Sequence, residues 1–291
     1  MIRASQTWAV ARYELIWDLR KKRTYFIAGL SLFAAFTFGY LVPMAARGSI
    51  TSTPFNPGMS GLWWVNVVEV VFNTLTSGLF PLLIGGIIAA DSLASEFDKN
   101  TIVPLLTQPI TRLELYGGKF LEKILVLLFV TILFTLVVLV ASEASVGAQT
   151  QLYAFPLVVF FEFGAILQYA ALAFLVGVIA RSGSMVLGIL IGLFFVVTGI
   201  VFLLGHQFGF QETMLLLPVA NPNFLLNVIP YSVVQPSGNM VLQGTLMGAW
   251  TPPVSVTVVS AIEYVVIGLA MNLVAALAAG YYFFKKAEVK K

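Results

Sequence analysis

Apolar residues in this chain come in long blocks, not in the narrow stripes of an amphipathic soluble helix. A helix needs about 20 predominantly apolar residues to cross the ~30 Å hydrocarbon layer of a membrane. Six blocks meet that length. We therefore expect an all-α integral membrane protein whose residues 1–291 form a single transmembrane domain with six transmembrane helices. The predicted spans cover about residues 25–46, 65–90, 123–142, 152–180, 184–205 and 255–284.

Composition agrees with a membrane protein. Hydrophobic residues make up 59% of the chain and charged residues only 10%, whereas a soluble domain carries about a quarter charged residues. The net charge of +3 is too small and too segregated to indicate nucleic acid as a partner. The absence of cysteine excludes disulfides and cysteine-based metal sites.

The basic residues orient the chain. If the N-terminus lies in the cytoplasm, 15 of the 16 Lys and Arg residues fall in cytoplasmic segments, and only Arg47 lies outside. The opposite orientation would invert the rule that basic residues stay on the cytoplasmic side. We therefore expect a multi-pass protein of the plasma membrane with both termini in the cytoplasm.

Residues 4–22 precede the first span and predict an interfacial helix. Trp8, Ala11 and Leu15 fall along one helical stripe, from which Glu14 and Asp18 are displaced. A short cytoplasmic extension of the first span is the alternative.

The segment 206–254 forms the predicted extracytoplasmic loop before the last span. It contains six prolines and two apolar runs, at 214–218 and 224–229, that are too short to cross a membrane. Short re-entrant or interfacial helices fit these runs, provided that protein or water satisfies their backbone.

The segment 91–119 is the long cytoplasmic connection, between the second and third spans. Its first part can continue the second span as a short helix, and Pro104 and Pro109 then require turns and extended backbone. The pattern Thr111-Arg-Leu-Glu114 matches a capping box, in which each residue satisfies the other's backbone amide. A new helix is predicted to begin here and to run into the third span.

In this segment the chain resembles the ABC-2 type exporter permeases. Those proteins carry, after their second span, an acidic residue, Gly-Thr, an apolar stretch, a Ser-Pro-like turn, an Arg and a Gly-Lys pair. Asn100 stands here where Gly is usual and Gln108 where Ser is usual. The detailed match covers about thirty residues, and it is carried by Glu96, Thr101, residues 103–106, Gln108-Pro109, Arg112 and Gly118-Lys119.

The resemblance implies that residues 91–119 are a coupling loop that docks on a separate ATP-binding cassette subunit. Charged side chains would fix the register of that contact, and Phe97 would anchor in a groove of the partner. The residues implied are Glu96, Phe97, Asp98, Lys99, Thr101 and Arg112. Solvated loop charges with no partner are the alternative interpretation.

The resemblance also implies a function. The chain would be the permease subunit of an exporter that moves substrate outward, working as a homodimer within membrane lipid. The partner subunit would bind ATP and Mg²⁺, and this chain would hold no cofactor of its own.

Motifs for catalysis are missing. Gly117-Gly118-Lys119 is followed by Phe120 and not by Ser or Thr, so it does not form a phosphate-binding P-loop. His206 is the single histidine, and no Ser/His/Asp set or metal-ligating motif can be assembled around it. We therefore expect no catalytic residue and no metal site in this chain, and the ATPase site in another.

Three carboxylates interrupt the predicted spans: Glu69, Glu162 and Glu263. Counted from the cytoplasmic ends at ~1.5 Å per residue, all three lie near the outer interface. They would face outer headgroups or a hydrated vestibule, or they would form an outer gate on the pathway. An ATP-independent, ion-coupled secondary transporter or channel that uses these carboxylates is thus the alternative function, and a membrane scaffold without transport is a third.

Overall fold

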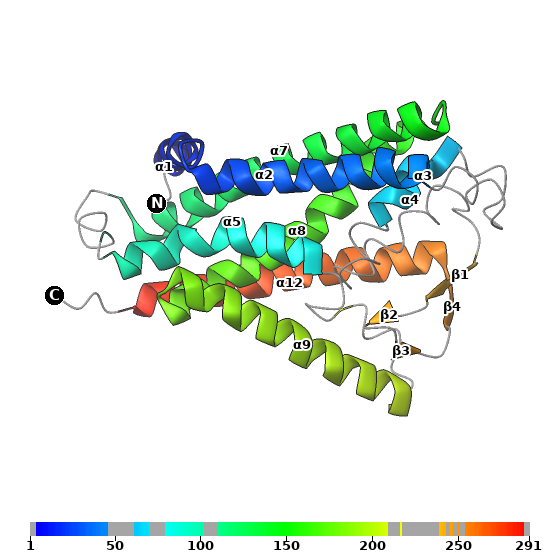
Figure 1. Cartoon of the computed structure of the whole chain (residues 1–291). Coiled ribbons are helices and arrows are strands. Elements are labelled where there is room, and N and C mark those ends of the chain that lie inside the picture. Colours follow the sequence, from blue (N-terminus) through cyan, green and yellow to red (C-terminus); the bar gives the residue numbers. More distant parts are fainter. Residues whose placement is uncertain are drawn as a thin grey trace.

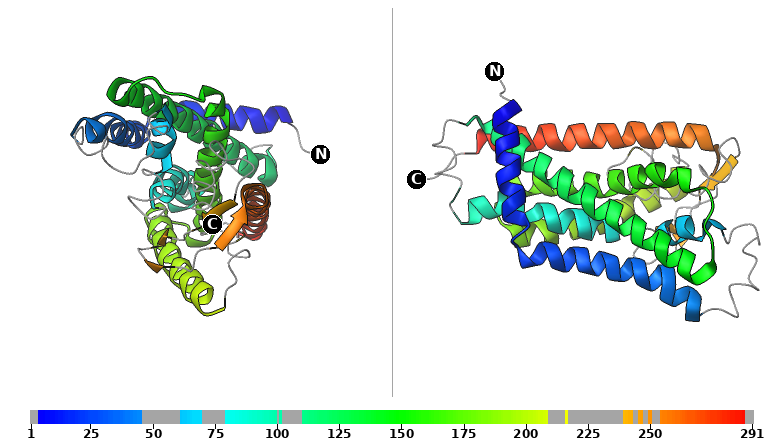
Figure 2. Two further views of the ribbon diagram at one scale, coloured as in Figure 1. Left: turned by 90° about the vertical axis from the view of Figure 1, so that its right-hand side faces the viewer. Right: turned by 90° about the horizontal axis from the view of Figure 1, so that it is seen from above.

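The computed structural model describes residues 4–45, 61–69, 79–99, 101, 110–208, 216, 239–242, 245–246, 249–250 and 254–287. Its long helices run side by side, and α1 (Ala4–Asp18) lies across one end of them (Figures 1 and 2). The other helices are α2 (Lys22–Phe36), α3 (Val42–Ala45), α4 (Trp63–Glu69), α5 (Leu79–Asp98), α7 (Arg112–Val146), α8 (Phe155–Ala180), α9 (Gly183–Phe208) and α12 (Val258–Lys286). A π-helical stretch (Thr37–Leu41) joins α2 to α3, and a 3₁₀ turn (Leu152–Ala154) precedes α8.

The described part of the chain supports four or five of the six predicted spans. Four helical stretches are long and apolar enough to cross a membrane: Lys22–Ala45, Arg112–Val146, Leu152–Ala180 and Val258–Lys286. Helix α5 adds a fifth if its two parts, bent by 42°, form one span. The predicted fifth span coincides with α9, of which Gly183–Val197 counts as a shorter apolar helix. Six spans are therefore not established.

Helix α8 lies at the centre of the bundle. It packs against α5, α7, α9 and α12, and residues such as Phe161, Tyr169 and Phe174 are almost wholly buried. Close packing of α5 on α8 depends on Gly85, because a Cβ there would lie 2.3 Å from the backbone oxygen of Ile166. The core thus holds α5 and α8 together as one unit.

Short strands precede α12, where only helices were predicted. Strand β1 (Asn239–Leu242) pairs antiparallel with β4 (Val254–Thr257), and β2 (Thr245–Leu246) pairs with β3 (Ala249–Trp250). The alternating sequence Val-Ser-Val-Thr of β4 is typical of a strand. The two apolar runs that suggested short helices lie outside the described residues, except for Leu216.

Several helix ends and one turn lie together at the end of the bundle where α1 lies. They are the ends of α5, α8 and α12, the start of α7 and α9, and the turn between α1 and α2 (Figure 1). The predicted coupling segment 91–119 belongs to this end. Helix α5 continues to Asp98, as expected, and α7 begins at Arg112.

Candidate functional site

The predicted capping box is present and fixes where α7 begins. The side-chain oxygen of Thr111 accepts a hydrogen bond from the backbone N–H of Glu114 at 3.2 Å, and the carboxylate of Glu114 accepts one from the N–H of Thr111 at 2.8 Å. Both donors would otherwise lack partners at a helix start. Because the start is fixed, the positions of Gly118 and Lys119 on the next turns are fixed as well.

Helix α1 crosses α7 at Gly118. A Cβ at this position would lie 2.7 Å from the Cβ of Val10 and 2.9 Å from the backbone oxygen of Thr7. The neighbouring Gly117 has much more room, since its nearest atom is the Cγ2 of Thr7 at 3.8 Å. The missing side chain of Gly118 therefore allows α1 to lie directly on α7.

Lys119 joins three helices. Its ammonium group lies 2.6 Å from Glu14 Oε1 on α1 and 3.2 Å from Glu96 Oε1 on α5, and its side chain is only 1% exposed. Burying an unpaired ammonium group would be costly, and two carboxylates offset that cost. We call the contacts of Gly118 and Lys119 with α1 and α5 the α1–α5–α7 clamp.

A second ion pair lies one helical turn further along both α1 and α7. Lys123 pairs with Asp18, and its ammonium group is 3.0 Å from Glu122; Lys21 lies 2.5 Å from Asp18 as well. Burial raises the pKa of the Asp18 carboxyl, but the charges of Lys123 and Lys21 outweigh burial and hold that pKa below its ordinary value. Asp18 therefore stays ionised and paired at neutral pH.

Glu96 accepts a second hydrogen bond, from the hydroxyl of Thr101. Thr101 itself is exposed. Glu96 thus connects an exposed residue of the predicted coupling loop to the buried ammonium group of Lys119.

Arg112 binds the end of α12. Its Nη1 donates to the backbone oxygens of Phe284, Lys285 and Ala287, at 3.3, 2.6 and 3.4 Å. The last carbonyl groups of a helix lack partners within the helix and carry partial negative charge, which an arginine satisfies well. Arg112 therefore ties the start of α7 to the last turn of α12.

Phe97 is packed inside this chain. Its ring contacts that of Phe284 edge to face, with centroids 6.2 Å apart, and the guanidinium of Arg181 lies 5.5 Å from its centroid. Its half-buried side chain links α5, α12 and the turn between α8 and α9. Asp98 and Lys99, by contrast, are exposed.

The six predicted coupling residues thus have two kinds of environment. Glu96, Phe97 and Arg112 hold helices of this chain together, whereas Asp98, Lys99 and Thr101 lie on its surface.

The two membrane carboxylates whose side chains the structure describes, Glu162 and Glu263, have different environments. Glu162 on α8 is fully buried and accepts a hydrogen bond from Thr135 on α7, so its side chain faces the bundle interior and not lipid headgroups. Glu263 on α12 is exposed. The side chain of Glu69, at the end of α4, lies outside the described part of the chain.

Sequence reasoning missed the role of α1's acidic residues. Glu14 and Asp18 were assigned to the polar side of an interfacial helix, yet they face α7, and the aromatic rings of Tyr13 and Trp17 are 64% and 52% exposed. A signal was present in the sequence. Glu14 and Asp18 are an acidic pair four residues apart on α1, and Lys119 and Lys123 are a basic pair four residues apart on α7.

Apolar helices of spanning length, joined at one end by buried ion pairs and helix caps, define a polytopic helical membrane protein. Residues 8–289 match the family model described as ABC-2 family transporter protein, and the chain belongs to that family. No curated protein matches the chain.

Membership has direct consequences. The chain is the multi-pass membrane component of an ABC-2 transporter, in a permease family that lacks the ATPase domain. ABC-2 permeases generally pair with an ATP-binding subunit.

Proposed function

We propose that this chain is the permease subunit of an ATP-driven exporter, and that the α1–α5–α7 clamp transmits movement from a separate ATP-binding subunit to the membrane helices. The observation that carries this proposal is the position of Lys119, whose buried ammonium group binds α1 through Glu14 and α5 through Glu96. A displacement of α5 or α7 at this point cannot leave α1 behind without separating buried charges, which is costly.

Transmission begins at the exposed residues Asp98, Lys99 and Thr101, which the partner subunit contacts. The hydroxyl of Thr101 donates a hydrogen bond to Glu96, and Glu96 in turn pairs with Lys119. Force on this surface therefore reaches Lys119. The other end of the coupling segment is tied to α12 through Arg112. Movement of the segment therefore displaces α1, α5, α7 and α12 together, and opening of the pathway follows as a switch between two packed arrangements.

The charge distribution supports one orientation of the chain in the membrane. Basic residues are found at the end of the bundle that holds the clamp, including the run 20–23 between α1 and α2 and Lys285-Lys286 at the end of α12, which supports a cytoplasmic location of this end and of both termini. The partner binds ATP and Mg²⁺ there, and substrate leaves at the opposite end. Two copies of the chain form a homodimer around the pathway.

Purification of the tagged full chain from its own cells tests this proposal. An ATP-binding subunit should copurify and its ATPase activity should rise when the permease is present. A doubly substituted variant, Asp98→Arg with Lys99→Glu, should recover less of the partner, while Glu143→Arg, an exposed change on the last turns of α7, should recover as much as the wild type. Recovery of the intact permease without any ATP-binding protein would contradict the proposal.

One observation favours the ion-coupled alternative. The Oε1 atom of Glu162 is buried without a hydrogen-bond partner in the described part of the chain. Because burying a carboxylate within a membrane is costly, such a residue is a candidate for a function in transport. That alternative requires Glu162 for transport and no ATP-binding partner, so neutralising Glu162 separates the two functions.

A further inference from the structure

A cleft of about 590 Å³ opens beside the clamp, between α1, the end of α5 and the start of α9. Three cations line it, Arg20, Lys21 and Lys99, together with one carboxylate, Asp98. Lys21 is paired with Asp18. Arg20 and Lys99 are exposed and form no ion pair within the described ranges, so their charge is available to a ligand.

The start of α9 adds hydrogen-bond donors to the same cleft. Gly183 and Ser184 line it, and the first backbone hydrogen bond of the helix runs from Val186 N to Ser182 O. The amides of residues 183–185 therefore have no acceptor within the helix. Cations from two other elements together with free amides at a helix start favour an anion with several oxygens, as a phosphate has.

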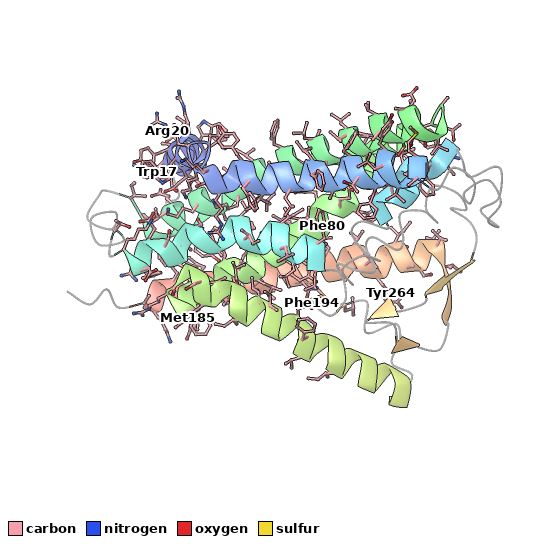
Figure 3. The ribbon with its side chains drawn as sticks, viewed as in Figure 1. Trp17, Arg20, Phe80, Met185, Phe194 and Tyr264 are labelled. Carbon is pink, nitrogen blue, oxygen red and sulfur yellow. The ribbon has the colours of Figure 1, made fainter. Side chains whose placement is uncertain are left out.

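The surroundings of the cleft indicate where such a phosphate comes from. Trp17 lines the cleft with half of its surface exposed, and Tyr25 and Phe26 on the first turns of α2 are 61% and 70% exposed. Figure 3 shows Trp17, Arg20 and Met185 at the same end of the bundle, where α1 lies and α9 begins. Exposed aromatic rings beside basic residues are typical of the headgroup layer of a membrane.

We propose that this cleft is a binding site for the phosphate of an anionic phospholipid headgroup. Arg20 and Lys99 bind the phosphate oxygens, and the amides at the start of α9 complete the site. The site does not rest on the proposed export function, but it shares Asp98 and Lys99 with the surface assigned there to the ATP-binding subunit. A lipid in the cleft and that subunit would therefore compete for these two side chains. Occupancy would connect α1, α5 and α9 through one ligand.

Asp98 lowers the affinity of the cleft for an anion. Its carboxylate opposes a phosphate in the same cleft, so Asp98→Asn should strengthen binding of an anionic lipid. A site that merely collected lipids by apolar contact would not respond to this change.

Native mass spectrometry of the delipidated full chain, titrated with phosphatidylglycerol or phosphatidylcholine, tests the site. The wild type should retain one phosphatidylglycerol per chain in preference to phosphatidylcholine. The pair Arg20→Gln with Lys99→Gln should weaken phosphatidylglycerol binding by about thirtyfold, since each cation near an anionic membrane surface contributes about fivefold. The control pair Arg12→Gln with Lys22→Gln removes two exposed cations that do not line the cleft and should stay within about twofold.

Three results would overturn the proposal. The first is equal weakening by the two pairs, which would show attraction by general charge. The second is binding of inorganic phosphate that millimolar phosphatidylglycerol does not displace, which would identify a soluble anion as the ligand. The third is unchanged lipid binding by the Arg20 and Lys99 pair with loss of the ATP-binding partner, which would assign the cleft to a protein.

Discussion

The ammonium group of Lys119 lies 2.6 Å from the carboxylate of Glu14, across the contact at which Gly118 lets α1 rest on α7. The resemblance to ABC-2 permeases included this Gly-Lys pair, and the structure gives each residue a separate physical role. Glycine allows the close approach of two helices, and lysine binds the helix that has approached. Both residues contact α1, which lies outside the coupling segment 91–119.

Removing the lysine should destabilise the chain. Lys119→Met leaves two carboxylates without their cation, and breaking a buried ion pair from one side costs about 3 kcal/mol or more. We expect a lower unfolding temperature in detergent, whereas Lys22→Met, at an exposed position, should have little effect.

The loss of stability caused by Lys119→Met should depend on the presence of Glu14. In a double-mutant cycle of Lys119→Met with Glu14→Gln, the combined change should be smaller than the two separate changes added together, because the residues are in contact. Strict additivity would show that the contact contributes nothing to stability.

Gly117 provides a matched control for a test of Gly118. Gly118→Ala should force α1 away from α7, since the new Cβ would meet a backbone oxygen at 2.9 Å, and overpacking of this kind costs about 1–3 kcal/mol. Gly117→Ala has space and should be tolerated. Thermal unfolding and partner ATPase stimulation should both fall in the first variant only, and equal behaviour of the two would argue against close packing at position 118.

Acid should weaken the second ion pair. The pKa of Asp18 is held below its ordinary value in the folded chain, so its pair contributes stability above the unfolded pKa of about 4 and loses it as the pH falls through the folded pKa. Wild type should therefore be more stable than Asp18→Asn at pH 7, and the difference should shrink below pH ~4. A difference that is constant between pH 7 and pH 3 would show that Asp18 is not paired.

The arginine at the start of α7 should hold the end of α12 in place. Arg112→Gln removes donors to the last carbonyl groups of α12, so the last turn should fray. Hydrogen exchange at residues 281–287 should become faster, while exchange in the first turns of α12 should not change. Unaltered hydrogen exchange at residues 281–287 would show that Arg112 does not hold the last turn of α12, and would contradict its proposed role in transmitting movement.

Local features of this fold were predictable from sequence. The capping box of Thr111 and Glu114 needs residues only three positions apart, and its chemistry fixes the helix start whatever the tertiary fold is. Apolar block length located four of the spans by the same kind of local rule.

Features that depend on distant residues could not be predicted in this way. Glu14 and Lys119 are 105 positions apart, and nothing local states that the polar side of α1 faces another helix. Strand β4 was not predicted because its apolar residues continue directly into α12, so that the strand resembled the start of a span. The ring contact of Phe97 with Phe284 could not be predicted because Phe284 lies far away in the sequence, near the end of α12.

Neutralising Glu162 separates ATP-driven from ion-coupled transport. In an ATP-driven exporter the side chain only packs between α7 and α8, where it accepts a hydrogen bond from Thr135. Glu162→Gln keeps its shape and should leave stimulation of the partner's ATPase within about twofold of the wild type. Complete loss of transport with normal chain abundance and normal partner binding would favour the ion-coupled alternative.

Stimulation of the partner's ATPase activity by Glu96→Arg tests the central claim most directly, because this change places a second cation against Lys119 and breaks the clamp between α5 and α7. The control, Glu143→Arg, makes the same charge change at an exposed site outside the clamp. If the clamp transmits movement, the partner still copurifies with Glu96→Arg but its ATPase activity is no longer stimulated, while Glu143→Arg behaves as the wild type. Full stimulation by Glu96→Arg, in a chain that is inserted and abundant, would contradict the account.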